Sequence, residues 1–119
     1  MTILTNILIS KSSFSGIKLK ESVDLALVCA AFELQVNLIF IDHGVHALVK
    51  RQNATLIGCK NHVDLIKGLE FYDIESVYVE EESLDKYNIS TDELFENIQV
   101  VSRDFIANSN IKANHLVNF

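Results

Sequence analysis

Short apolar runs alternate along this chain with longer stretches in which apolar residues recur every three or four positions. The short runs are typical of β-strands, because they are rich in Val, Ile and Leu and are bounded by polar residues. The run at 36–41 is apolar on both faces, which is typical of a central parallel strand. Strands are predicted at residues 3–9, 36–41, 75–80 and 114–119, and residues 54–59 are ambiguous.

Helical periodicity predicts a first helix over residues 17–33, with further helices beginning near 45–50, at 62–71 and near 82–87. Positions 25–32 of the first helix are apolar all round, so we expect it to be covered on more than one side. Residues 97–102 fit two alternatives, a strand or the middle of a helix running from Thr91 to Ala107.

This order of elements predicts a single doubly wound α/β domain over residues 1–119. Strands that alternate with helices form a mainly parallel sheet, here of about five strands, with helices on both faces. In such sheets, sites lie beyond the carboxyl ends of the strands. That rule selects residues 10–16, residues 42–46 and the segment after Val79.

The charge of the chain argues against direct binding of nucleic acid. The net charge is −6, and of the 10 basic residues only Lys50 and Arg51 are adjacent. Neutralising phosphates requires a basic face, so we expect no direct contact with RNA or DNA.

The chain is expected to be cytoplasmic and to have no membrane-spanning segment. No stretch approaches the ~18 unbroken apolar residues of a membrane span. The opening "MTILTNILIS" lacks the basic leader and cleavage site of an export signal. In a reducing cytosol Cys29 and Cys59 are expected to be thiols, and their separation does not form a metal pattern.

The two cysteines have different predicted roles. Cys29 lies within "LALVCAAF" and is predicted to be a buried, small apolar residue. Cys59 lies between a glycine and a lysine near a predicted helix start, where a thiolate is favoured. Cys59 is therefore the candidate catalytic residue if this chain carries sulfur by itself.

The segment "DHGVH" allows two interpretations. Asp42, His43 and His46 could form part of a metal site, because histidines three positions apart can share a helix face. A turn explains the same residues more simply: Asp42 would cap the following helix, and Gly44 would allow a tight turn. Since no third His, Cys or Glu lies at a ligand spacing, we predict the turn and no metal or cofactor.

The other polar segments are also interpreted structurally. The loop "SKSSFSG" at 10–16 has neither GxGxxG nor GxxxxGK[ST], so helix capping is favoured over phosphate binding. Tyr72 and Asp73 lie at a turn between a helix and a strand, and the acidic run "EEES" at 80–83 is predicted to be a solvated face.

Four segments, taken in order, resemble the DsrE/DsrF-like family, and most closely its TusC (DsrF-type) branch. These segments are "FIDHGVHAL", "GLEFYDIESVYV", "ESLDKYNIS" and the terminal "HLVNF". The resemblance implies a subunit that assembles with TusB-like and TusD-like subunits in a cytoplasmic heterohexamer. Such complexes receive or pass persulfide sulfur through TusE-like or TusA-like carriers toward 2-thiouridine at the tRNA wobble position. The related DsrF-type complex serves sulfur oxidation, and the sequence leaves these two pathways open.

One departure from the family pattern bears on catalysis. The resemblance implies that the TusD-like subunit carries its sulfur-bearing cysteine at the position of Val79, next to Tyr78 and Glu80. Valine has no nucleophile, so this chain is expected not to be an enzyme by itself. The alternative is a self-sufficient sulfurtransferase that uses Cys59. Subunit contacts are expected at Asp42, His43, Gly44, His46, Tyr72 and Asp73, and along the helix at 17–34.

Overall fold

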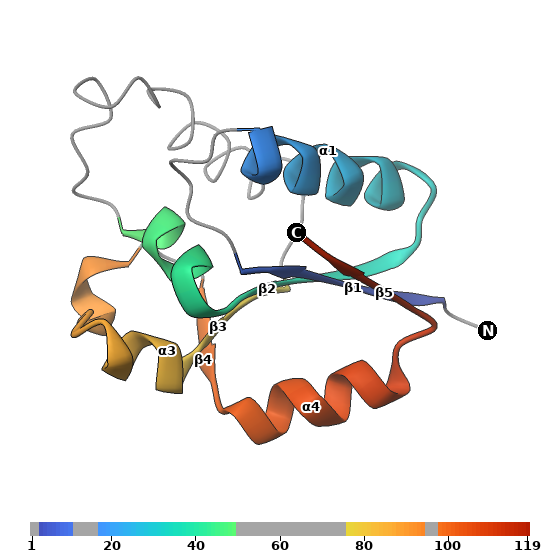
Figure 1. Cartoon of the computed structure of the whole chain (residues 1–119). Coiled ribbons are helices and arrows are strands. Elements are labelled where there is room, and N and C mark those ends of the chain that lie inside the picture. Colours follow the sequence, from blue (N-terminus) through green and yellow to red (C-terminus); the bar gives the residue numbers. More distant parts are fainter. Residues whose placement is uncertain (1–2, 11–16, 50–75, 95–97) are drawn as a thin grey trace.

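The centre of the protein is a parallel β-sheet (Figure 1). The computed structural model describes residues 3–10, 17–49, 76–94 and 98–119, and within these ranges the sheet has five strands in the order β4-β3-β2-β1-β5. Each neighbouring pair of strands runs parallel. The strands are β1 (Leu4–Ile9), β2 (Gln35–Phe40), β3 (Val77–Glu80), β4 (Gln99–Val101) and β5 (His115–Asn118).

Helices cover both faces of this sheet, which confirms the predicted doubly wound α/β class. The helix α1 (Ile17–Ala31) lies on one face, and α4 (Arg103–Lys112) lies on the opposite face (Figure 1). Three short helices follow strands or loops near the carboxyl ends of the strands: η2 (Asp42–Leu48), α3 (Glu81–Lys86) and η4 (Thr91–Glu93). No helix among the described residues is long and apolar enough to cross a membrane.

The structure resolves the alternatives for residues 97–102 in favour of a strand. One continuous helix through this region is wrong, because β4 comes first and α4 begins only at Arg103. Ser102 fixes this start: its backbone is extended, and its Oγ accepts a hydrogen bond from the Phe105 N–H at 3.2 Å. The predictions for residues 11–16, 54–59 and 62–71 lie outside the described residues.

Two apolar clusters hold the layers together. The cluster on the α1 side is the larger, and Cys29 lies in it at 7% exposure, as predicted. The cluster on the α4 side contains Leu8, Ile39 and Ile106. The α1-side cluster includes Ile7, Ile9, Val23, Ala26, Val36, Leu38, Phe40, Val77 and Val79.

A chain of buried amides fixes α4 against the sheet. Asn6 on β1 is fully buried, and its Oδ1 accepts a hydrogen bond from Asn37 Nδ2 on β2 at 3.0 Å. The Asn6 Nδ2 donates to Ser109 Oγ at 3.0 Å and to Asn110 Oδ1 at 2.9 Å, both on α4. Because buried amides need partners, this pairing specifies where α4 lies along the strands.

The turn after β2 differs from its prediction in both of its key residues. Asp42 does not cap the next helix: the capping position is Ile41, and no side chain caps it. Asp42 instead adopts the left-handed conformation, with φ of 48°. Gly44 is needed for space, because a Cβ there would lie 1.9 Å from the Ile9 carbonyl oxygen. The helix that follows is a 3-10 helix from Asp42 to Leu48.

Substitutions at residues 42 and 44 should therefore have opposite effects. Gly44→Ala should lower the free energy of unfolding by about 3 kcal/mol or more, because the added methyl group meets rigid backbone of β1. Asp42→Gly should be neutral or stabilise by up to about 1 kcal/mol, because glycine adopts positive φ without steric cost. Urea unfolding of both variants measures this, and a Gly44→Ala chain as stable as the native one contradicts the packing described here.

Candidate functional site

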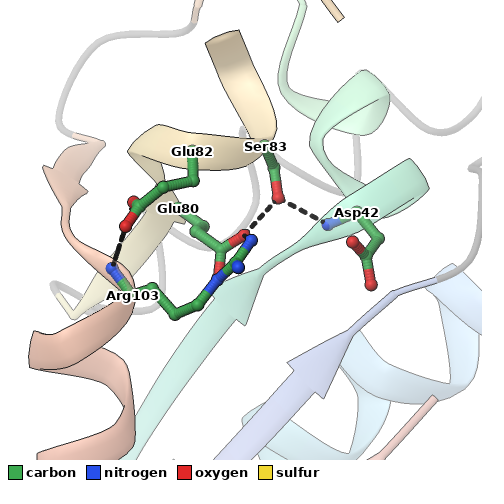
Figure 2. A network of polar contacts seen from close by, with 5 residues as sticks. All are labelled: Asp42, Glu80, Glu82, Ser83 and Arg103. Atoms are coloured by element: carbon green, nitrogen blue, oxygen red, sulfur yellow. Dashed lines mark hydrogen bonds and ion pairs between the residues drawn. The ribbon is translucent and has the colours of Figure 1, made fainter. Parts of the chain in front are cut away.

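A group of polar side chains lies where β3 ends and α3 begins, in the predicted segment after Val79 (Figure 2). Glu80, the last residue of β3, is 5% exposed, and Ser83 in the first turn of α3 is 1% exposed. The interpretation of residues 80–83 as a solvated acidic face is therefore wrong for these two residues. Glu81 and Glu82 are exposed, in agreement with it.

Three donors satisfy the buried Glu80 carboxylate. The Arg103 guanidinium donates from Nε to Oε2 at 3.3 Å and from Nη2 to Oε1 at 3.2 Å. The Ser83 hydroxyl donates to Oε1 at 2.5 Å. Because the Arg103 side chain is 65% exposed, the pair has one buried partner and one partner in contact with water.

The same group of residues joins four elements. Ser83 Oγ accepts a hydrogen bond from the Asp42 backbone N–H at 2.9 Å, which ties α3 to the turn after β2. The Glu82 carboxylate accepts the Arg103 backbone N–H with both oxygens at 3.1 Å, at the first turn of α4. Figure 2 shows the side chains of Glu80, Glu82 and Ser83 meeting Arg103 of α4 and the backbone N–H of Asp42, whose carboxylate points away. The carboxyl edge of the sheet is thus crosslinked by polar contacts.

Burial and hydrogen bonding act in opposite directions on Glu80. Burial raises the pKa of the Glu80 carboxyl, whereas the hydrogen bonds from Arg103 and Ser83 and the Arg103 charge lower it, and the net result is a pKa below the ordinary 4.5. The hydrogen bond to Glu80 and its charge raise the pKa of Arg103. Glu80 is therefore ionised at neutral pH, and this residue contributes stability above its unfolded-state pKa that is lost as the pH falls through its lowered pKa.

A cluster of three rings lies beside this group. His43 and His46 on η2 have nearly parallel rings with centroids 6.3 Å apart. The Tyr87 ring, which directly follows α3, lies 5.2 Å from the His43 ring and 4.9 Å from the His46 ring. Burial, and then the nearby His43, lower the pKa of His46, so its imidazole is neutral at pH 7. Sequence reasoning found both histidines but missed Tyr87, because residues 44 positions apart along the chain carry no local signal.

The structure brings together some of the predicted site residues. Asp42 and His43 are exposed, Gly44 is buried and His46 is half-buried. In the part of the chain that the structure describes, no three His, Cys, Asp or Glu residues are grouped closely enough to hold a metal. The predictions for Cys59, Tyr72 and Asp73 fall outside the described residues.

Among the residues that the structure describes, the edge around Glu80 offers charge and hydrogen bonds but no thiol. Val79 is fully buried, and Glu80 is occupied by its ion pair. Cys29, the thiol that the described residues contain, is buried in the α1-side cluster. The geometry thus defines a doubly wound α/β protein whose sheet edge, in its described part, is held together by polar contacts.

Comparisons with known proteins agree with this class. The family model of the DsrE/DsrF-like family matches residues 5–119. The TusC homolog of Vibrio vulnificus (strain CMCP6) is 33% identical over 82 residues, which cover 69% of this chain and 70% of that protein. The intracellular sulfur oxidation protein DsrF of Allochromatium vinosum is 31% identical over 86 residues, 72% of this chain and 63% of that protein.

Solved structures show the same fold at lower identity. The ychN protein of E. coli superposes with a TM-score of 0.77 at 18% identity, and the match covers 100% of both chains. The MTH1491 protein of Methanobacterium thermoautotrophicum gives a TM-score of 0.66 at 15% identity, over 98% of this chain. This chain therefore belongs to the DsrE/DsrF-like family, and its curated relatives are of the TusC/DsrF type.

Because Glu80 is buried in an ion pair, its replacement by Gln should lower stability in a pH-dependent way, whereas the same change at the neighbouring Glu81 should not. At pH 7, Glu80→Gln should lower the free energy of unfolding by about 1–3 kcal/mol, because the buried acceptor loses its charge. The difference from the native protein should shrink as the pH falls from the ordinary carboxyl pKa of 4.5 through the lowered pKa of native Glu80, because native Glu80 then also becomes neutral.

Glu81→Gln is the matched control, since Glu81 is exposed on the same turn. It should change the free energy of unfolding by less than about 0.5 kcal/mol at either pH. Urea unfolding at neutral and acid pH measures both variants. Equal stability of the two variants at pH 7 would count against the role given to Glu80.

Proposed function

We propose that this chain is a non-catalytic subunit of a cytoplasmic sulfur-relay complex of the TusBCD type. In this proposal the complex passes persulfide sulfur toward 2-thiouridine at the tRNA wobble position. The observation that carries the proposal is the end of β3, where the family resemblance implies a cysteine in the TusD-like subunit. Here that position is Val79, which is fully buried, followed by Glu80, whose carboxylate is bound by Arg103 and Ser83.

The chemistry of a sulfur relay explains why this difference matters. A persulfide forms on an accessible thiolate, which is favoured by positive charge and disfavoured by a nearby carboxylate. Val79 supplies no sulfur, and the exposed carboxylates of Glu81 and Glu82 follow directly. A subunit with these residues contributes to such a complex by binding its neighbours, while a thiol on a homologous subunit carries the sulfur.

The partners in this proposal are TusB-like and TusD-like subunits in a heterohexamer. Sulfur carriers of the TusE or TusA type dock on the assembled complex, and this chain itself contacts neither RNA nor membrane. Relatives named TusC homolog, at 33% identity, support this assignment. Asp42, His43, Gly44 and His46 on the carboxyl edge, with Tyr72 and Asp73, are the proposed subunit contacts.

A second candidate function is a DsrF-type subunit of a sulfur-oxidation complex. A relative named intracellular sulfur oxidation protein DsrF, at 31% identity, supports it nearly as well. Both functions require the same assembly from small α/β subunits and differ in the acceptor that receives the sulfur. Operon context and the acceptor of labelled sulfur distinguish them.

The outer side of α1 supplies a further proposed contact. The side chains of Val28 and Phe32 are 53% and 74% exposed, and both lie on the side away from the buried residues of this helix. Large apolar side chains that are exposed next to each other on a helix and its end are typical of subunit interfaces. This exposure supports the expectation that a neighbouring subunit covers the helix at 17–34.

Co-expression with the adjacent reading frames, followed by native mass spectrometry, tests the proposed function. We expect a stable complex with two small homologous α/β subunits. Cys59→Ser should leave both the complex and the thiolation of tRNA unchanged. If the chain remains a monomer in the presence of these proteins, the proposal is refuted. A labelled persulfide on Cys59 of the isolated chain would refute it in favour of a self-sufficient sulfurtransferase.

Phe32→Ser tests the contribution of α1 to assembly. The variant should unfold within about 0.5 kcal/mol of the native chain, because its side chain lies mostly in water in the isolated chain. Its affinity for the other subunits should fall about tenfold or more, because an exposed aromatic residue at an interface is a typical hot spot. Ile111→Ser on α4 is the control: Ile111 is 82% exposed, and its loss should leave assembly unchanged.

A further inference from the structure

The outer face of α1 carries acidic as well as apolar side chains. Glu21, Asp24 and Val28 follow one another at spacings of three and four residues, so they share one side of the helix, and all three are exposed. Phe32 continues the same line, because its N–H donates a hydrogen bond to the Val28 carbonyl oxygen four positions earlier. Glu33 is exposed directly after it. These five residues are called the outer face of α1 below.

The charges on this face have a single sign. Residues 21–35 contain three carboxylates and no Lys, Arg or His. An acid lies at each end of the apolar pair Val28 and Phe32, since Asp24 comes about one turn before the pair and Glu33 directly follows it. Four residues of α-helix span about 6 Å, which is less than the Debye length of about 8 Å at physiological ionic strength. A surface that covers the apolar pair therefore comes within the field of these carboxylates.

This arrangement disfavours a second copy of the chain as the occupant of the face. If two copies packed here with their helices parallel, Asp24 would face Asp24. If the helices ran antiparallel and met at Val28, Asp24 of one copy would lie next to Glu33 of the other. Like charges at the rim of an interface oppose association, and the net charge of −6 adds a general repulsion between copies.

We propose that the outer face of α1 binds a partner surface that has an apolar centre and Lys or Arg residues at its rim, and that it does not bind a second copy of this chain. The inference rests on the proposed function, in which the partner is one of the homologous subunits, and it adds the chemistry by which that subunit is recognised. Val28 and Phe32 supply the burial that holds the two surfaces together. The carboxylates select the partner, because they attract a basic rim and repel an acidic one.

Charge reversal at Asp24 in the co-expressed complex tests this recognition. Asp24→Lys should weaken binding of the other subunits about tenfold or more, because the basic rim of the partner then meets a base. The affinity of the native chain should fall as the salt concentration rises, and the affinity of the variant should depend less on salt. Native mass spectra of each complex over a dilution series, at several concentrations of ammonium acetate, measure both effects.

Asp104→Lys is the matched control. Asp104 is an exposed aspartate on α4, on the opposite face of the sheet (Figure 1), and its replacement changes the net charge by the same amount. This variant should bind the other subunits as tightly as the native chain does. Circular dichroism of both variants before each measurement verifies that they are folded.

The results that overturn this inference differ from those that overturn the proposed function. If Asp24→Lys assembles as tightly as the native chain, or if Asp104→Lys weakens assembly equally, the acidic face does not select the partner, and the subunit role still stands. If the isolated native chain is a dimer in analytical ultracentrifugation and Phe32→Ser makes it a monomer, the occupant is a second copy and the inference is refuted. If the native chain joins no complex, the proposed function fails and this inference fails with it.

Discussion

The buried carboxylate of Glu80 is the constraint on which the carboxyl edge of this sheet depends. A charged group at 5% exposure has to be neutralised and hydrogen-bonded, and Arg103 and Ser83 meet both requirements. Each of these residues also has a backbone or side-chain contact to another element, through Glu82 or Asp42. The contacts around this single charge at the end of β3 therefore tie together α3, the start of α4 and the turn after β2.

The opposite end of α4 depends on neutral polar groups instead. Asn6 and Asn37 pair across two central strands, and Ser109 and Asn110 accept the remaining protons of Asn6. An apolar face would let the helix slide along the sheet, whereas buried amides lose their hydrogen bonds on any shift. With Arg103 at its start and Asn110 near its end, α4 is held at both ends by directional contacts, with Ile106 as its buried apolar contact between them.

The sequence predicted the fold more fully than the site, for physical reasons. Apolar runs indicate burial directly, so the alternation of strands and helices along the chain predicts the parallel sheet with helices on both faces, and the run at 36–41 predicts a central strand. The turn at residues 42–44 was misread because its strain is at Asp42 and its close approach is to Ile9, a strand away. The burial of Glu80 and the approach of Tyr87 to two histidines are long-range effects, which no local spacing records.

The same reasoning bears on the proposal that a homologous subunit, and not this chain, carries the reactive thiol. At the end of β3 a side chain can either point into solvent as a nucleophile or turn inward to organise the edge, and one residue cannot do both. In this chain Glu80 turns inward, and the Arg103 guanidinium binds both oxygens of its carboxylate. Val79 directly before it is fully buried in the α1-side cluster and leaves no room for an exposed thiol at that position. A rigid edge suits the subunit contacts proposed for it, because little conformational entropy is then lost on binding.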